Sequence, residues 1–160
     1  MMDITRLFTR AEPTLSEAAA RDSAAMAALH AASFRRGWSD GEFERLLADR
    51  AVVAHRAMLA GALVGFIISR LAAGEAEILS VAVAASARGR GLAAAMLHLH
   101  LRRLAGLGAQ AVFLEVDEDN VPACRLYAKA GFHEVARREG YYRDEGGRAS
   151  TALVLRRDLG

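Results

Sequence analysis

Hydrophobic and polar positions along the chain follow a helical spacing first and a strand spacing afterwards. An alanine-rich stretch can form a first helix, which Asp22 or Ser23 caps and which runs to about Ser33. Ser39 or Asp40 can cap a second, shorter helix. The apolar residues that should form the buried face of this second helix are Phe43, Leu46 and Leu47.

Three extended segments come next. Segments 51–58 and 62–71 are apolar, and the second is rich in Val, Ile and Phe. Segment 75–84 alternates, so its two faces carry different residues. Gly61 and Gly74 supply turns between the segments, which predicts an antiparallel meander. One face of the third segment carries Ile78, Ser80 and Ala82, and the other carries Leu79, Val81 and Val83.

The second half of the chain alternates helical and extended patterns. A long helix is predicted over 91–107, a buried strand over 110–116 and a helix over 120–130. Segments 132–138 and 148–156 should form the last two strands. Because helix 91–107 connects two strands, the crossover rule predicts that those strands are parallel. Its apolar stripe consists of Ala93, Leu97, Leu101 and Leu104.

Composition fits one globular domain over residues 1–160, in which the first ten residues or so look additional. Hydrophobic residues make up 53% of the chain and charged residues 25%. No apolar run reaches the roughly 18 residues of a membrane span, and the N-terminus lacks the pattern of a secretory signal. A single cysteine, Cys124, cannot form an internal disulfide, which fits a reducing compartment. We therefore expect a cytoplasmic protein without a membrane partner.

The charge pattern favours a small anionic ligand over a nucleic acid. The formal net charge is +2, and Lys129 is the only lysine among the 21 basic residues. The arginines are scattered and are not interleaved with aromatic residues, so the footprint of a nucleic-acid-binding surface is missing. The five histidines lack the spacing of metal ligands, and His98 and His100 should face different sides of one helix. We therefore expect no metal.

Two glycines follow the third extended segment directly before the long helix, in the run Arg88-Gly89-Arg90-Gly91. Glycines let the backbone turn its N–H groups toward one point, and a helix N-terminus adds about half a positive charge there. Such a turn can cradle a pyrophosphate, although the spacing is neither that of a Walker A loop nor that of a dinucleotide-binding fingerprint. The alternative is a plain flexible turn.

Glu115 stands at the carboxyl end of an apolar strand. A carboxylate beside a core suits a general base, because its surroundings hold less water than the surface does. The alternative is that the strand simply emerges into solvent at this residue.

Asn120 and Tyr127 lie seven residues apart on one predicted helix, so they share a face. Asn120 is a natural N-cap with a spare amide for a ligand, and a phenol two turns away can donate a proton to a leaving group. The alternative is a helix cap beside a half-buried aromatic ring. We interpret Cys124 on the same helix as a small packing residue, because it has no convincing base partner.

Two adjacent tyrosines, Tyr141 and Tyr142, follow Gly140 in a predicted loop. Aromatic residues in a loop suit contact with a flexible peptide, and ordinary packing at a sheet edge is the alternative.

Together these residues resemble the GNAT superfamily of N-acetyltransferases. The run from Arg88 to Ala93 fits its acetyl-CoA motif, Gln/Arg-x-x-Gly-x-Gly/Ala, and a strand, an Asn, a Tyr and a Gly-Phe pair follow in the expected order. The resemblance covers about residues 51–155. Within the superfamily the chain is similar to bacterial ribosomal-protein-alanine N-acetyltransferases, both between Leu114 and Tyr142 and between Ala32 and Ser39.

The resemblance implies a role for each matching residue. Glu115 would be the general base and Tyr127 the general acid. Trp38, Tyr141 and Tyr142 would contact the acceptor. Acetyl-CoA would be held by Val81, Ala82 and Val83 at its pantetheine arm, by Arg88, Gly89, Arg90, Gly91, Leu92, Ala93 and Ala94 at its pyrophosphate, and by Asn120.

The resemblance also implies a fold and an activity. The fold would be the α/β GNAT fold, a mixed central sheet flanked by helices, with the strands near Val83 and Glu115 splaying apart at the acetyl-CoA site. The activity would be direct transfer of acetyl to the N-terminal α-amine of a protein, with a ribosomal protein as the expected partner. A small amine or a lysine side chain is the alternative acceptor. A non-catalytic acetyl-CoA-binding module is disfavoured, because such a module needs neither Glu115 nor Tyr127.

Overall fold

A seven-stranded mixed sheet forms the centre of the computed structural model, which describes residues 11–143 and 146–160. The strands lie in the order β1-β2-β3-β4-β5-β7-β6. The prediction about the N-terminal segment falls on residues 1–10, outside the described residues. The strands are β1 (Thr14–Glu17), β2 (Val52–Leu59), β3 (Ala62–Ala72), β4 (Glu75–Val83), β5 (Ala111–Asp117), β6 (His133–Arg143) and β7 (Ala149–Asp158). The α-helices are α1 (Ser23–Ser33), α2 (Asp40–Ala48), α3 (Leu92–Gly106) and α4 (Val121–Lys129), with short 3-10 turns η2 (Ala20–Asp22) and η3 (Ala85–Ala87).

The strand pairing confirms the predicted mixed sheet. Strands β2, β3 and β4 form an antiparallel meander, and α3 carries the chain from β4 to the parallel strand β5. Strand β1 was not predicted, because its four residues lack a clear apolar alternation; it pairs with β2 at the sheet edge. Strand β7 inserts between β5 and β6, antiparallel to both.

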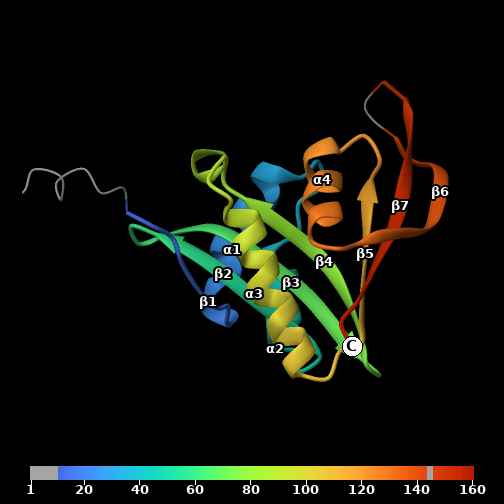
Figure 1. Cartoon of the computed structure of the whole chain (residues 1–160). Coiled ribbons are helices and arrows are strands. Elements are labelled where there is room, and N and C mark those ends of the chain that lie inside the picture. The colour runs from blue at the N-terminus through green and yellow to red at the C-terminus, as the bar shows by residue number, and fades with distance from the viewer. Residues whose placement is uncertain (1–10, 144–145) are drawn as a thin grey trace, which may run out of the picture.

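Helices cover both faces of this sheet, as Figure 1 shows. Helix α3 crosses the near face in that view, and its buried residues share one core with α4 and with β5 and β7. Helices α1 and α2 lie behind the sheet and enclose a second, smaller core around Met26, Phe43 and Phe66. No helix in the described part of the chain is long and apolar enough to cross a membrane.

The predicted N-cap residues of the first two helices behave differently. Ser39 caps α2 as expected, because its Oγ accepts from the Glu42 N–H at 3.2 Å and its own N–H donates to the Glu42 carboxylate at 2.9 Å. Asp22 precedes α1 but makes no side-chain cap there. Its carboxylate accepts instead from the Ala19 N–H at 2.8 Å and from Arg56 of β2 at 2.6 Å. The Asp22 carboxylate therefore joins the start of α1 to strand β2 of the sheet.

Strands β4 and β5 part after a short paired stretch. Their last paired residues are Ile78 and Leu114, although β4 runs on to Val83. The β3–β4 register shifts at the same place, leaving Leu79 of β4 without a partner on β3. An extra residue in one strand bends that strand, so β4 turns away from β5. Figure 1 shows the two strands together at one end and diverging toward the other, as the predicted fold requires.

The predicted loop at Tyr141 and Tyr142 is wrong, because β6 continues through both residues to Arg143. Tyr142 pairs with Ser150 of β7 after a register shift that begins beyond Arg138. Gly140 lies inside this irregular stretch with φ +65°, a conformation that glycine adopts at little cost. The glycine thus marks a bulge, after which the strand resumes, rather than the end of the strand.

Three buried polar side chains join α3 to the sheet. His100 of α3 is fully buried, and its Nδ1 lies 2.7 Å from Nδ1 of His55 on β2. One of the two rings therefore donates a hydrogen bond to the other. The other nitrogen of His100 lies 2.6 Å from the hydroxyl of Ser69 on β3. Burial lowers the pKa of His100 to about 3, with His55 adding a smaller effect, so the ring stays neutral inside the protein.

Acid should therefore destabilise the fold before it protonates His100 in the native state. The pKa of His100 is near 6.5 in the unfolded chain and about 3 in the folded protein. The stabilisation that its neutral ring contributes is therefore fully present above pH 6.5 and is lost as the pH falls toward 3. The expected loss from this ring at pH 5 is about 2 kcal/mol, measured by urea unfolding at pH 7.5 and 5. His98→Asn on the exposed side of the same helix should keep the same loss. Equal stability at both pH values would contradict this account.

Candidate active site

The part of β4 beyond Ile78 offers backbone groups that no strand uses. The Ala84 N–H donates to the Val64 carbonyl of β3 at 2.8 Å. Backbone groups alternate in direction along a strand, so Ala82 also faces β3 while Val81 and Val83 face the side that β5 has left. The Val83 carbonyl accordingly accepts from the Arg88 side chain at 3.1 Å. These groups can pair with an extended, amide-bearing ligand, as an added strand would.

The start of α3 supplies N–H groups at one end of this edge. Gly89 and Gly91 have φ of +78° and +73°, which lets the chain turn sharply into the helix. Gly91 occupies the N-cap position, and no side chain caps the helix. The first-turn N–H groups, from Leu92 onward, have no partners within the helix and carry its positive end. The arrangement suits a phosphate or pyrophosphate.

A cavity of about 420 Å³ joins the β4 edge to the helix start. The sequence-predicted cofactor residues gather here, with the exception of Arg90, which lines a different hollow beside the segment from Ala11 to Pro13. The predicted residues that line this cofactor cavity are Val81, Ala82, Val83, Arg88, Gly89, Gly91, Leu92, Ala93, Ala94 and Asn120.

A second cavity, of about 410 Å³, lies between β4, β5 and the α1–α2 loop. It contains the predicted residues Trp38, Glu115 and Tyr142, and we call it the acceptor cavity. The two cavities border one another. The residues that line both are Phe34, Val81, Asn120, Ala123 and Tyr127.

Tyr127 lies at this junction and is 8% exposed. Its ring packs edge-on against Phe132, with centroids 5.6 Å apart. Burial raises the pKa of Tyr127 to about 12, with a smaller contribution from Cys124, so the phenol keeps its proton at neutral pH. Asn120 caps α4 by accepting from the Ala123 N–H at 3.3 Å, which leaves its amide N–H groups for a ligand.

Glu115 reaches the acceptor cavity but is not desolvated as expected. Its side chain is 32% exposed and forms a 3.7 Å ion pair with Arg138 of β6. The reason is the parting of the strands, because β4 no longer covers β5 where Glu115 stands. Water therefore reaches the carboxylate and can link it to an acceptor amine.

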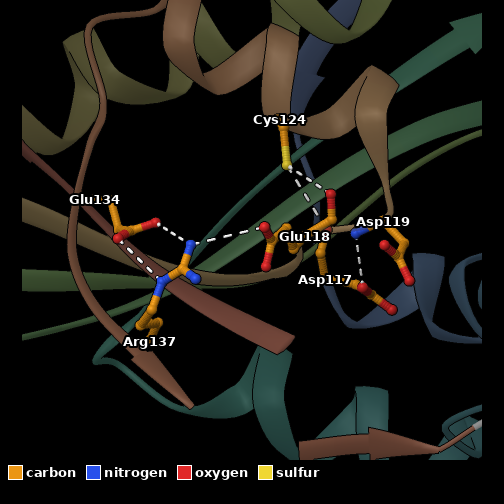
Figure 2. Close-up of polar contacts among 6 residues, drawn as sticks. All are labelled: Asp117, Glu118, Asp119, Cys124, Glu134 and Arg137. Atoms are coloured by element: carbon orange, nitrogen blue, oxygen red, sulfur yellow. Dashed lines mark hydrogen bonds and ion pairs between the residues drawn. The ribbon is translucent and has the colours of Figure 1, made fainter. Parts of the chain in front are cut away.

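Cys124 behaves as a packing residue, as Figure 2 shows. Its Sγ points back at the β5–α4 connection and donates weakly to the carbonyls of Asp117 at 3.7 Å and Glu118 at 3.9 Å. Burial raises the pKa of the thiol, and Asp117 and Glu118 raise it further. The reactive thiolate is therefore scarce. The same figure shows Arg137 of β6 between Glu118 and Glu134, which ties β6 to this connection.

The structure brings Tyr142 into the acceptor cavity but leaves Tyr141 out of both cavities. Neighbouring side chains of a regular strand point to opposite faces, but β6 is irregular between Arg138 and Tyr142, and the two tyrosine rings contact each other with centroids 5.2 Å apart. Tyr141 is 52% exposed and packs under Arg138, whose guanidinium lies 5.3 Å from the ring centroid. Contact between Tyr141 and an acceptor stays a prediction.

Among the charged or titratable residues that line the acceptor cavity, three were not predicted: His30, Arg36 and Asp117. Asp117 follows Glu115 by two positions on one strand, so strand periodicity could have found it. Its carboxylate accepts from the Ser150 hydroxyl and from the Asp119 N–H, both at 2.9 Å. No sequence signal marks His30 or Arg36, because their place depends on how α1 docks. The described residues contain no group of three or more His, Cys, Asp or Glu side chains able to hold a metal ion.

A known protein family matches more than half of the chain. The model of the acetyltransferase (GNAT) family matches residues 23–132, which run from α1 through α4 and include every lining residue of the two cavities except Tyr142. The chain belongs to the GNAT acetyltransferase family. This confirms the resemblance drawn from the Arg88–Ala93 motif and its surroundings.

Particular relatives of this GNAT chain include a [ribosomal protein bS18]-alanine N-acetyltransferase of Haemophilus influenzae, 33% identical over 93 residues. That match covers 58% of the chain and 63% of the relative, so it spans less than two thirds of the relative's length. The fold is similar to the crystal structure of the ribosomal-protein-S18-alanine N-acetyltransferase from Escherichia coli (TM-score 0.86, 24% identity, 92% and 94% of the two chains). It is also similar to Arabidopsis thaliana NAA60 in complex with a bisubstrate analogue (TM-score 0.82, 20% identity, 92% and 98%).

A side chain at Gly91 should block the cofactor cavity. Gly91 lines this cavity, and a Cβ built there meets nothing within 4 Å, so a larger side chain has room beside the helix start. We expect Gly91→Val to weaken acetyl-CoA binding about tenfold or more, measured by calorimetry. Gly61→Val is the matched control: its φ is +81°, its surroundings are equally open, and it lies in the β2–β3 turn. Both variants should lose similar stability, but Gly61→Val should bind acetyl-CoA normally. Unchanged binding by Gly91→Val would contradict the assignment.

Proposed function

We propose that this GNAT chain transfers the acetyl group of acetyl-CoA to the N-terminal α-amine of a protein, within a ternary complex. The observation that carries the proposal is the meeting of two cavities of similar size at Val81, Asn120 and Tyr127. One cavity has the chemistry for a phosphorylated, amide-rich donor, and the other carries a carboxylate beside aromatic side chains. A thioester reaching from the first to the second would stand beside the Tyr127 phenol.

The proposed donor, acetyl-CoA, would lie along the cofactor cavity. Its pyrophosphate would lie at the start of α3, beside Arg88 and the glycine turn. Its pantetheine arm would run along β4 and pair with backbone groups of Val81 and Val83. A backbone N–H freed by the parting of β4 and β5 would also polarise the thioester carbonyl.

The reaction would be a direct displacement. Glu115, directly or through a water molecule, takes a proton from the acceptor ammonium, and the neutral amine attacks the thioester carbonyl. The carbon–sulfur bond then breaks, Tyr127 protonates the departing thiolate, and the surplus proton of the new amide nitrogen returns to the phenolate, directly or through water. A phenol that remains protonated at neutral pH suits this step. No covalent enzyme intermediate forms, in agreement with the raised pKa of the Cys124 thiol.

The kind of acceptor is supported by both cavity and relatives. An N-terminus enters as an extended chain, and Phe34, Trp38 and Tyr142 offer aromatic surfaces that would flank it. The Haemophilus influenzae relative is named for the alanine of a ribosomal protein, which supports a ribosomal protein as the target here. A small amine is the competing acceptor, because the same cavity contains Arg36 together with Glu115 and Asp117 and so also suits a small zwitterion.

Replacing Tyr127 with Phe should lower kcat by about 10²-fold or more, because only the proton donor is lost. The ring still packs on Phe132, so acetyl-CoA affinity should remain close to that of the wild type. Pre-steady-state kinetics and calorimetry separate the two effects. Tyr141→Phe, outside both cavities, makes the same chemical change and should leave kcat unaltered. A wild-type kcat for Tyr127→Phe, with chemistry rate-limiting, would make Tyr127 structural.

The acceptor proposal predicts preference for α-amines over lysine side chains. An α-amine has a pKa of about 8, against about 10.4 for lysine, so a base of modest strength such as Glu115 suffices for it. The substrates to compare are peptides that begin with alanine, the same peptides with blocked N-termini and free lysines, and small polyamines. Mass spectrometry locates the acetyl group.

We expect kcat/KM to be about tenfold or more higher for the free N-terminus. Preferential acetylation of the blocked peptides or of the polyamines would overturn the N-terminal proposal. Acetyl-CoA binding without transfer to any amine would instead favour a binding module.

A further inference from the structure

His30 connects the wall of the acceptor cavity to the core. It stands in the last turn of α1 and is 3% exposed, and its ring lines the acceptor cavity. Nδ1 accepts a hydrogen bond from the backbone N–H of Trp38 at 3.1 Å. A buried histidine that accepts at Nδ1 must be neutral, with its proton on Nε2.

Aromatic contacts extend the same connection. The His30 ring stacks on Trp38, with centroids 4.5 Å apart and planes 20° apart, and contacts Phe34 at 4.4 Å. Both of these residues line the acceptor cavity. On the core side His30 meets Phe43 at 5.6 Å and Phe66 at 6.4 Å. A single ring thus joins two cavity-wall aromatics to two core aromatics.

The segment from Phe34 to Ser39 is held at its ends by other contacts. At one end the Phe34 N–H donates to the His30 carbonyl, and at the other Ser39 caps α2. Arg35 also donates to the Arg143 carbonyl of β6 at 2.9 Å. Gly37 lies so near α1 that a Cβ there would come within 3.1 Å of Ala31. The hydrogen bond from the Trp38 N–H to His30 also holds this loop against α1.

The charges around His30 decide how readily it protonates. Burial lowers the pKa of His30 below 6.5, and the Glu42 carboxylate on α2 opposes this in part. The β3 and β4 residues around it are apolar or neutral. The charged or titratable groups that share the acceptor cavity with it are Arg36 in the loop, Glu115 and Asp117 on β5, Tyr127 on α4 and Tyr142 on β6.

We propose that His30 is a positioning residue for the acceptor: its neutral imidazole holds Phe34 and Trp38 in place as the cavity wall, and protonation releases them. Protonated Nδ1 becomes a donor and cannot accept from the Trp38 N–H. Acceptor binding should therefore weaken as the pH falls below 6.5, and acetyl-CoA binding should change less, because Trp38 lines the acceptor cavity and not the cofactor cavity, which shares Phe34 alone of the two. The acceptor part of this inference rests on the proposed function.

Two variants separate the hydrogen bond from the ring. His30→Phe keeps an aromatic ring but loses the acceptor atom, whereas the amide oxygen of His30→Asn replaces Nδ1 but does not titrate. At pH 8, His30→Phe should raise the acceptor KM about tenfold, with kcat and the acetyl-CoA KM within about twofold of wild type. His30→Asn should resemble wild type at pH 8. Equal rises in both KM values for His30→Phe, or an equal defect in His30→Asn, would overturn the proposal.

The pH dependence is measured as the ratio of the acceptor KM of wild type to that of His30→Asn, because protonation of the acceptor amine affects both proteins alike. The ratio should rise as the pH falls below 6.5, and a constant ratio would overturn the proposal.

Fluorescence gives a test that needs no acceptor. Trp38 is the only tryptophan of the chain, so its emission reports directly on the stacked pair. The wild type should show a transition below pH 6.5 that His30→Asn lacks, at pH values where circular dichroism shows both folded. Identical titrations would overturn the proposal even if His30→Phe failed to fold. If no amine is acetylated, the proposed function fails while the fluorescence comparison still decides the role of His30.

Discussion

The parting of β4 from β5 is the constraint on which the rest of the structure depends. Pairing stops at Ile78 and Leu114, and the unmatched Leu79 bends β4 away at that point. A buried strand normally has neighbours on both sides, because unpaired backbone groups away from water are costly. Here the groups of Val81 and Val83 that no strand pairs border a cavity instead, and the Val83 carbonyl accepts from Arg88. The gap between β4 and β5 is therefore also the place where a ligand can pair with the edge of β4.

The same parting brings donor and acceptor chemistry together. Helix α3 starts where β4 ends, so its N–H groups stand at one end of the open edge. Helix α4 follows β5, and its Asn120 and Tyr127 face the space between the strands. Glu115 comes from β5 itself, on the far side of Tyr127 from the glycine turn. Each group reaches the junction only because the two strands no longer touch.

The acceptor side and the donor side are built from different parts of the fold. The cofactor cavity is formed largely by β4 and by the starts of α3 and α4. The acceptor cavity depends on the α1–α2 loop, which is joined to the smaller core through His30 and through the contact of Trp38 with Phe43, and on β6 at the sheet edge. Specificity for the acceptor can therefore change through loop and edge residues while the donor site stays intact.

The sequence by itself determined the order of the elements from α1 to β7, the meander, the parallel crossover and the glycine turn before α3. These follow from local rules: residue period, glycine conformation and helix capping. Tertiary structure alone decided that Tyr142 lines the cavity while Tyr141 contacts Tyr142 and Arg138 outside it, since β6 continues through both residues after the irregular stretch at Gly140. It also decided that Glu115 meets water and Arg138, and that His30 supports Trp38. These outcomes depend on contacts between residues distant in the chain, which no local pattern records.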